Sequence, residues 1–136
     1  MWIDDIKLVG YYLDENETEI LIPDGIEEIA AGVFSFCNKI EKVHLPQSLR
    51  KIGTGAFHAC NNLKEIRFPE ELESIEQEAF KECYTLRKIY FSLSLVEIGR
   101  FAFQFCIELR DIENFNKKVK MDETCFAGCG KLILNT

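Results

Sequence analysis

The strongest constraint in this chain is an internal repeat with a period of 23 residues. Five phenylalanines follow that period without an insertion or deletion, at Phe34, Phe57, Phe80, Phe103 and Phe126. A fixed period of this length is the signature of solenoids and related repeat architectures, in which each repeat forms one structural unit. The chain is therefore expected to fold as a stack of similar coils.

Other columns of the sequence keep the same register. A cysteine follows each phenylalanine at constant spacing, and further columns are aliphatic or carry proline. The cysteine column is Cys37, Cys60, Cys83, Cys106 and Cys129. One coil cannot bury its own apolar face, so equivalent side chains of neighbouring coils must stack, about 4.8 Å apart as in a parallel sheet. We predict that the Phe and Cys columns are structural ladders of the core.

The unit spanning residues 63–83 shows how one coil is expected to run. Residues 63–68 have the apolar spacing of a short strand, which Pro69 ends. Residues 72–75 suit a second extended segment, and residues 79–83 suit one helical turn. The predicted fold class is therefore α/β.

The motifs of the repeat resemble the BspA-like branch of the leucine-rich repeats. The resemblance covers about residues 20–134, and its Leu-Pro, Ile-Gly and Ala-Phe-x-x-Cys motifs are most complete at residues 45–46, 52–53 and 56–60. It implies a right-handed leucine-rich-repeat solenoid, or horseshoe, of about five coils. It also implies a role in adhesion or in binding other proteins, often at a bacterial or protozoan surface.

We expect a single leucine-rich-repeat domain over residues 1–136. Its predicted parts are an N-terminal cap at residues 1–19, regular repeats at residues 20–112 and a degenerate last repeat at residues 113–136. The size of the chain is that of one domain with one core.

The two ends are expected to differ. Residues 6–13 and 18–22 are predicted to pair as a hairpin around a polar turn at residues 14–17, which covers the first coil. At the other end, residues 132–134 are predicted to form a last strand without a successor. That edge either pairs with a second copy to give a homodimer, or is followed by more of a longer natural protein.

Composition disfavours several classes of partner. The formal net charge of −7 repels phosphate backbones and anionic membranes, and no Lys/Arg-rich run offsets it. The sequence contains neither a signal peptide nor an apolar stretch long enough to span a membrane. We therefore expect no nucleic-acid partner and no membrane insertion. The chain as written is predicted to be soluble and cytoplasmic, or surface-exposed or secreted if it is a fragment of a longer protein.

Residues capable of catalysis or metal binding are sparse. The six cysteines lack paired zinc-ligand spacing, and only Cys125 and Cys129 are close in sequence outside the ladder period. His44 and His58 fall in different parts of the coil, so no nucleophile and base can be matched. We predict no catalytic residue, no metal and no cofactor, with thiol chemistry at Cys125 and Cys129 as the only route to an enzyme.

The variable columns of the first strand of each coil are the candidate binding surface, because the concave sheet of a leucine-rich repeat is where ligands usually dock. One column stacks three cations in succession and the next adds an arginine and a tyrosine, which are common interface anchors. The predicted binding residues are Lys64, Arg67, Arg87, Tyr90 and Arg110. They form either a site for an acidic partner segment or a solvated face.

The neighbouring column, which contains Lys42, Glu65, Lys88 and Asp111, alternates in sign. Stacking places each of these charges beside its opposite, and such cross-strand pairs contribute about 0.2–1 kcal/mol each. We therefore expect this column to neutralise itself.

A second candidate interface comes from apolar residues in the fourth unit. They occupy positions that are mostly polar or small in the other copies, and they are Leu93, Phe101, Phe105 and Ile107. This excess apolar area is either a docking patch or a floor that the degenerate last repeat covers.

The leading hypothesis is a non-enzymatic protein–protein interaction module that binds an unidentified partner through the concave sheet. The alternative is a structural scaffold segment of a longer repeat protein, or a self-associating oligomer.

Overall fold

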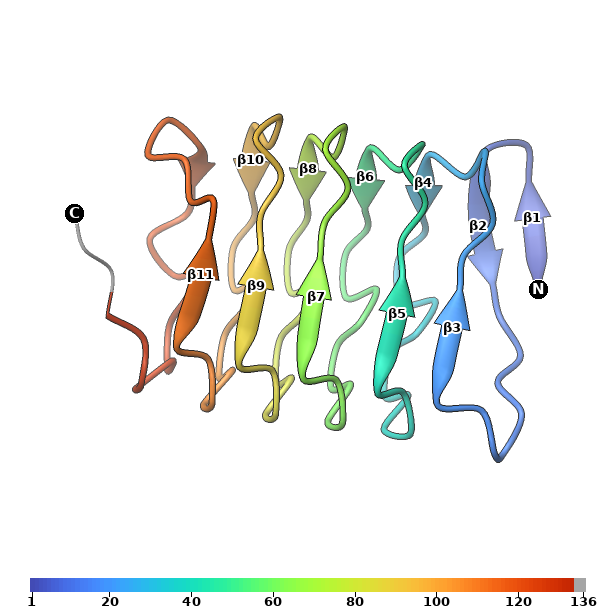
Figure 1. Cartoon of the computed structure of the whole chain (residues 1–136), viewed down its shortest axis with the longest axis horizontal. Helices are drawn as coiled ribbons and strands as arrows, with labels where there is room; N and C mark the ends of the chain where they lie inside the picture. Colours follow the sequence, from blue (N-terminus) through green and yellow to red (C-terminus); the bar gives the residue numbers. More distant parts are fainter. Residues whose placement is uncertain (134–136) are drawn as a thin grey trace.

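A computed structural model describes residues 1–133, which form short strands and, within that range, no helix. The strands are β1 (Trp2–Asp4), β2 (Lys7–Gly10), β3 (Glu19–Leu21), β4 (Glu28–Ile29), β5 (Lys42–His44), β6 (Lys51–Ile52), β7 (Glu65–Arg67), β8 (Ser74–Ile75), β9 (Lys88–Tyr90), β10 (Glu97–Ile98), β11 (Asp111–Glu113) and β12 (Lys120–Met121). From β3 to β12, each coil contributes one three-residue strand and one two-residue strand, on opposite faces of the stack (Figure 1).

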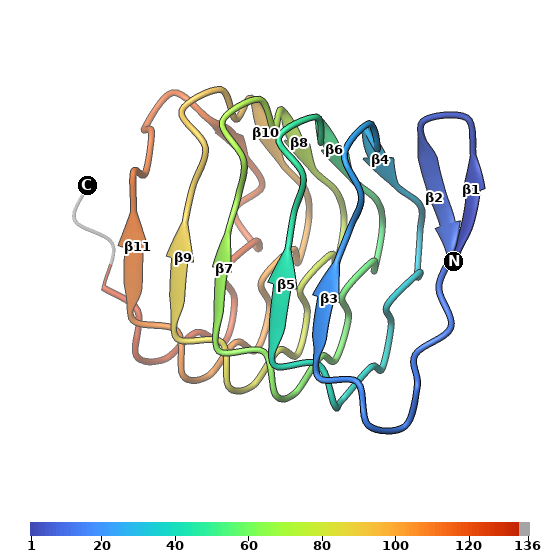
Figure 2. The ribbon, with the colours of Figure 1, turned by 45° about the vertical axis from the view of Figure 1, so that its right-hand side comes forward.

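The two faces are sheets that run the length of the solenoid (Figure 2). One is a seven-stranded sheet in the order β1-β2-β4-β6-β8-β10-β12. The other, here called the long-strand face, consists of a two-stranded sheet β3-β5 and a three-stranded sheet β11-β9-β7. Between successive coils the pairing is parallel, and Ile52 lies beside Ile75 one period later. The predicted solenoid of stacked coils is therefore confirmed.

The space between the two faces is filled by the repeated columns. Phe34, Phe57, Phe80 and Phe103 are fully buried, and their rings stack with centroid separations of 5.1 to 5.3 Å. The cysteines line a second ladder, in which every thiol after the first donates a hydrogen bond to a phenylalanine carbonyl of the preceding coil, such as Cys83 Sγ to Phe57 O at 3.2 Å, whereas Cys37 donates to Ser35 O. Both columns thus lie inside the stack, with only the end members Cys37 and Phe126 half-buried.

The segment after each two-residue strand forms tight turns where one helical turn was expected. In the unit at residues 76–83, the N–H of Cys83 bonds to the carbonyl of Phe80 at 3.3 Å, whereas the N–H of Phe80 bonds to Ala102 of the next coil at 2.7 Å. Glu78 and Glu82 have φ angles of 58° and 61°, in the left-handed region. A backbone that alternates local turns with bonds to the next coil cannot form the i to i−4 bonds of a helix. No helix long and apolar enough to cross a membrane occurs in residues 1–133.

The N-terminal hairpin is present but is formed by other residues than those predicted. β1 pairs antiparallel with β2, whereas β2 pairs parallel with β4 and β3 pairs parallel with β5. Residues 6–13 and 18–22 therefore do not pair with each other. β2 is the strand of one further, incomplete coil, and β3 is the first strand of the coil that follows it. Leu8 lies beside Ile29, only 21 residues later, so the incomplete coil escapes a search at the period of the others.

The last coil also differs from the prediction. Its strands are β11 and β12, and Leu132 and Ile133 lie outside any strand. Leu134 lies outside the described residues. The N–H of Leu132 bonds to the carbonyl of Cys129 at 3.1 Å, which continues the turn chemistry of the earlier coils instead of starting a strand.

Candidate functional site

The long-strand face is interrupted between β5 and β7. On one side of the break the N–H of Ile22 bonds to His44 O at 3.1 Å, and on the other the N–H of Phe68 bonds to Tyr90 O at 2.9 Å. Within the described chain the equivalent N–H of Leu45 makes no such bond, and β5 and β7 belong to separate sheets. Both views of the ribbon show these two strands further apart than their neighbours (Figures 1 and 2).

The break coincides with a change in the core. The position that is Leu45 in the coil of β5 becomes Phe68 in the coil of β7 and Phe91 in the coil of β9. The ring of Phe68 packs edge-on against Phe80, with centroids 5.6 Å apart and planes at 72°. Two phenylalanines per coil need more room than one phenylalanine and one leucine, and close-packed interiors transmit such volume changes. We attribute the separation of β5 from β7 to this step in side-chain size.

A groove of about 520 Å³ lies over the break. We call it the charged groove, because seven of its nine lining residues are charged or histidine side chains. Its lining consists of Glu41, Lys42, Val43, His44, Lys64, Glu65, Arg67, Arg87 and Tyr90. Four of the five predicted binding residues therefore lie together in one depression of the surface. Lys42 and His44 line it as well, although the sequence argument did not select them.

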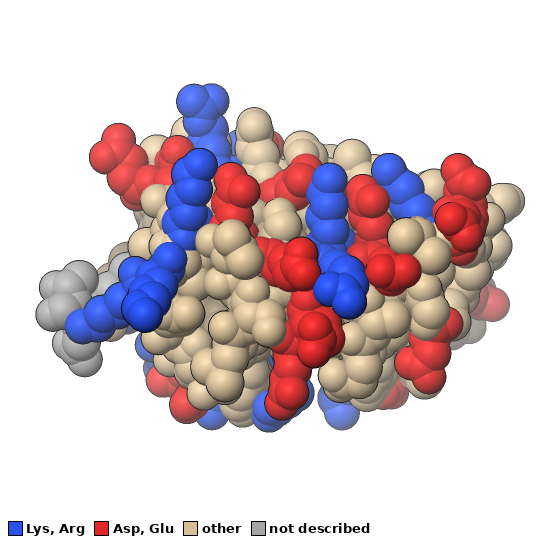
Figure 3. Space-filling model, turned by 90° about the horizontal axis from the view of Figure 1, so that it is seen from above, with Lys and Arg blue, Asp and Glu red and all other residues tan. Residues whose placement is uncertain are grey.

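The cations of the charged groove lack ion-pair partners. Among residues 1–133, none of the four has a carboxylate oxygen within 4.0 Å, and they are Lys42, Lys64, Arg67 and Arg87. Elsewhere charges are interleaved, as at the corner of the coils seen in Figure 3. Arg50, for example, lies 3.4 Å from Glu27 and 3.0 Å from Glu73. The lining thus holds four cations against the two carboxylates of Glu41 and Glu65, which leaves a net positive charge at the groove on a protein that is acidic overall.

The ring of Tyr90 contacts two cationic side chains. The guanidinium carbon of Arg67 lies 3.9 Å from the centroid of the Tyr90 ring, and Lys88 Nζ lies 4.8 Å from it on the same strand. These separations are within the range of cation–π attraction. The aromatic ring therefore holds Arg67 in position and leaves its N–H groups free for an acceptor.

The column of alternating charges does not neutralise itself as predicted. Lys88 is paired in register with both Glu65 and Asp111, but its ion pair, at 3.8 Å, is with Glu113. Register brings the Cα atoms together, whereas the flexible lysine side chain is drawn toward Tyr90 and Glu113. Glu65 consequently makes no ion pair within the described chain and faces the groove.

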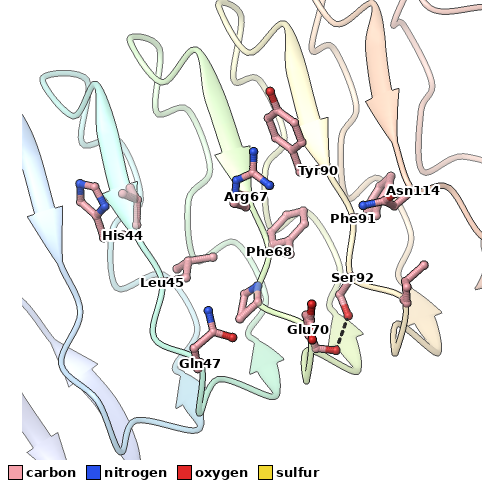
Figure 4. A pocket seen from close by; sticks show the side chains of 13 residues that line it. His44, Leu45, Gln47, Arg67, Phe68, Glu70, Tyr90, Phe91, Ser92 and Asn114 are labelled. Carbon is pink, nitrogen blue, oxygen red and sulfur yellow. Dashed lines mark hydrogen bonds between the residues drawn. The ribbon is translucent and has the colours of Figure 1, made fainter.

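A smaller pocket of about 340 Å³ adjoins the charged groove at the corner of the coils. His44, Arg67 and Tyr90 border both, and Figure 4 shows them on successive strands. Ser92 closes the floor by donating a hydrogen bond to Glu70 O at 2.9 Å. Leu93 is 73% exposed at the rim of this pocket. The apolar residue Leu93 therefore belongs to the same surface as the predicted cations.

The other predicted residues do not line the charged groove itself. Arg110 lines an adjoining hollow, which shares Lys64 and Arg87 with the groove, and it pairs with Glu108 at 3.3 Å. Phe105 lies against Gly128 of the last coil yet remains 43% exposed, and Ile107 is 47% exposed. Phe101 is half-buried. The last coil thus covers part of this apolar surface and leaves part of it open.

The histidines and thiols do not assemble a catalytic arrangement in the part of the chain that the structure describes. His44 forms an ion pair with Glu19, and the hydrogen bond lowers the pKa of Glu19. His58 Nε2 lies 3.3 Å from Glu82 on the turns. Burial raises the pKa of both Cys83 and Cys125 to about 12. No group of three potential metal ligands occurs in residues 1–133.

Thiol reactivity provides a test of the structural role of the cysteines. Because the thiolate is the reactive form, thiols with raised pKa remain protonated and slow at mildly alkaline pH. We expect native protein to show at most one fast thiol, Cys37, in a titration with an aromatic disulfide reagent, because it is the one cysteine that is not fully buried, although burial raises its pKa as well. Hydrogen bonding with Cys106 lowers the pKa of Cys129, but its burial keeps the reagent away. A Cys37→Ser variant should show none, and unfolded protein should show all its thiols. Fast reaction of Cys125 would contradict this assignment.

Comparison with known proteins agrees with the architecture. The pattern of the BspA type leucine-rich repeat region matches residues 6–133 in six copies. The chain belongs to the BspA type leucine-rich repeat family. The first of these copies starts within the N-terminal segment that was predicted to contain no repeat. No curated protein matches the chain.

Solved structures of bacterial leucine-rich repeat proteins share the fold of this BspA type protein. A leucine-rich repeat protein from Bacteroides ovatus is 24% identical with a TM-score of 0.70, and 90% of this chain matches 40% of that one. The pneumococcal vaccine antigen PcpA is 25% identical with a TM-score of 0.75, covering 90% of this chain and 32% of PcpA. A leucine-rich cell surface protein from Faecalibacterium prausnitzii is 27% identical with a TM-score of 0.60, covering 82% and 36%. This BspA type chain therefore spans less than half the length of these three proteins.

Proposed function

We propose that this chain is a non-enzymatic protein-binding module whose docking site is the charged groove of the long-strand face. Leucine-rich repeats of this kind are typical of proteins that bind other proteins or stand at a cell surface. The observation that carries the proposal is the set of unpaired cations around the break between β5 and β7.

The chemistry of the groove favours an acidic segment of a partner protein. Arg67 is held by Tyr90 with its N–H groups free, and Arg87 and Lys64 line the same depression. The guanidinium group of arginine can donate two parallel hydrogen bonds to one carboxylate, which adds geometric specificity to charge attraction. Leu93 at the rim offers an apolar contact beside the charges, so the partner segment combines acidic with apolar side chains. Adhesion to a surface protein is one setting in which such a module works.

The test uses an acidic peptide as the probe. A labelled peptide of Glu, Leu and Gly residues is expected to bind, to weaken as salt is raised, and to shift NMR signals of the groove residues. Arg67→Glu combined with Arg87→Glu should weaken binding at least about tenfold, because the substitutions replace attraction with like-charge repulsion.

Two controls, one a protein variant and one a peptide, distinguish binding at the groove from an effect of net charge. Lys117→Glu combined with Lys118→Glu changes the net charge equally at exposed residues far from the groove, and should leave the affinity nearly unchanged. A peptide with Lys in place of Glu should not bind. Equal effects of the two double variants, or signal shifts confined to another face, would contradict the proposal.

A further inference from the structure

The N-terminal hairpin presents an apolar surface that the rest of the chain does not cover. Trp2 is 58% exposed, Ile3 is 49% and Val9 is 45%. The indole of Trp2 lies over Gly10, where a Cβ atom would come within 2.9 Å of the ring, so one face of the indole is packed and the other faces solvent. Large apolar side chains left exposed on an edge strand mark a candidate interaction surface.

The hairpin also ends the seven-stranded sheet with an unpaired edge. Within residues 1–133, β1 pairs only with β2, and its outer side is free at the end of the solenoid opposite the last coil (Figures 1 and 2). Asp4 and Lys7 close a two-residue turn in which Asp5 has a φ of 55°. The closing residues of such a turn bond to each other and the bonding alternates along the strand, so Ile3 directs its N–H and C=O outward.

We propose that β1 pairs antiparallel with β1 of a second copy of this chain, with Ile3 at the two-fold axis. In that register Ile3 exchanges both backbone hydrogen bonds with its counterpart. Trp2 lies opposite Asp4 of the second copy, so no like charges face each other across the pair. The result is a continuous sheet through two solenoids, an isologous contact that closes as a dimer.

The opposite end of the solenoid is less suited to the same contact. The edge strand β11 consists of Asp111, Ile112 and Glu113. The equivalent antiparallel pairing centred on Ile112 would place Asp111 opposite Glu113 of the second copy, and like charges directly opposite destabilise a pair of strands. A homodimer through β11 is therefore disfavoured relative to one through β1.

The first experiment measures mass by sedimentation equilibrium into the millimolar range. The native chain is expected to show a monomer–dimer equilibrium, and Ile3→Lys should weaken it at least about tenfold by placing two ammonium groups at the axis. Leu93→Lys is the control, since Leu93 is also apolar and is more exposed than Ile3, at 73% against 49%, but is distant from β1, and it should leave the equilibrium unchanged.

The second experiment locates the contact. Residues of a hydrogen-bonded antiparallel pair have Cα atoms about 5.5 Å apart, within disulfide range. Ile3→Cys should therefore form a covalent dimer under mild oxidation, whereas Leu93→Cys and the native chain should not. A native chain that stays monomeric, a dimer that Ile3→Lys leaves intact, or equal cross-linking of the two cysteine variants would overturn the proposal.

Discussion

Replacing Phe80 with alanine is expected to lower the free energy of unfolding by about 3–5 kcal/mol, the range for truncating a fully buried phenylalanine. The ring is completely buried and stacked between Phe57 at 5.1 Å and Phe103 at 5.3 Å. Phe68 closes a third side, edge-on at 5.6 Å. Three coils therefore meet around the cavity that the substitution would leave, and their backbones are tied to one another by hydrogen bonds that resist collapse into it.

Urea unfolding of the native and variant proteins measures this loss. Phe126→Ala is the matched control, because Phe126 belongs to the same column but stacks on one side only, on Phe103 at 5.4 Å, and is half-buried. Its loss should be clearly smaller. A near-neutral effect of Phe80→Ala, or equal effects at both positions, would mean that the coils do not stack as described.

The second large effect is expected from Gly53→Val, which should cost at least about 1–3 kcal/mol, as overpacking of a tight interior does. A Cβ atom at Gly53 would come within 2.7 Å of Ile29 O and 2.9 Å of the Ala31 nitrogen. Those atoms belong to the backbone of the preceding coil, which cannot rotate away as a side chain could. The hydrogen bond from Gly53 N–H to Ile29 O, 2.8 Å long, would be strained by the same displacement.

Gly130→Val provides the comparison for this substitution. Among residues 1–133, no heavy atom lies within 4 Å of the position of a Cβ added at Gly130, and its φ is not in the left-handed region, so valine there should change stability little. Parallel urea titrations of the two variants measure the difference. Similar losses at Gly53 and Gly130 would argue that coil spacing is not what requires glycine at Gly53.

The coils were predictable because a fixed period dictates register. Ile52 and Ile75 are one period apart, and a parallel strand pair is the only arrangement that stacks all columns at once. The first coil was not predictable on this basis, since Leu8 and Ile29 are offset by 21 residues and the pattern around them is incomplete. The predicted helical turn failed for a different reason. Its N–H groups are used by the next coil, which local apolar spacing does not reveal.

The candidate site was also predictable from the sequence only in part. Arg67 and Tyr90 were expected together because equivalent positions on adjacent strands must be neighbours. The strand register also fixes the Cα position of Arg110. Its side chain, however, turns toward Glu108, and that direction depends on the rotamer and not on the register. Lys42 was missed because alternating signs along its column suggested mutual neutralisation. The break between β5 and β7 depends on whether side-chain volume or backbone hydrogen bonding prevails. That balance cannot be read from any single column of the repeat.

The step from Leu45 to Phe68 has a consequence for how such chains diversify. Coils with one core phenylalanine stack closely on one another, and so do coils with two. The groove forms where a coil of the first type stacks on a coil of the second type. Moving that junction by a single substitution in a neighbouring coil would relocate the groove by one repeat while leaving every surface residue in place. A family built on one scaffold could thus present the same depression to different side chains, and change its binding specificity through a residue that no partner ever touches.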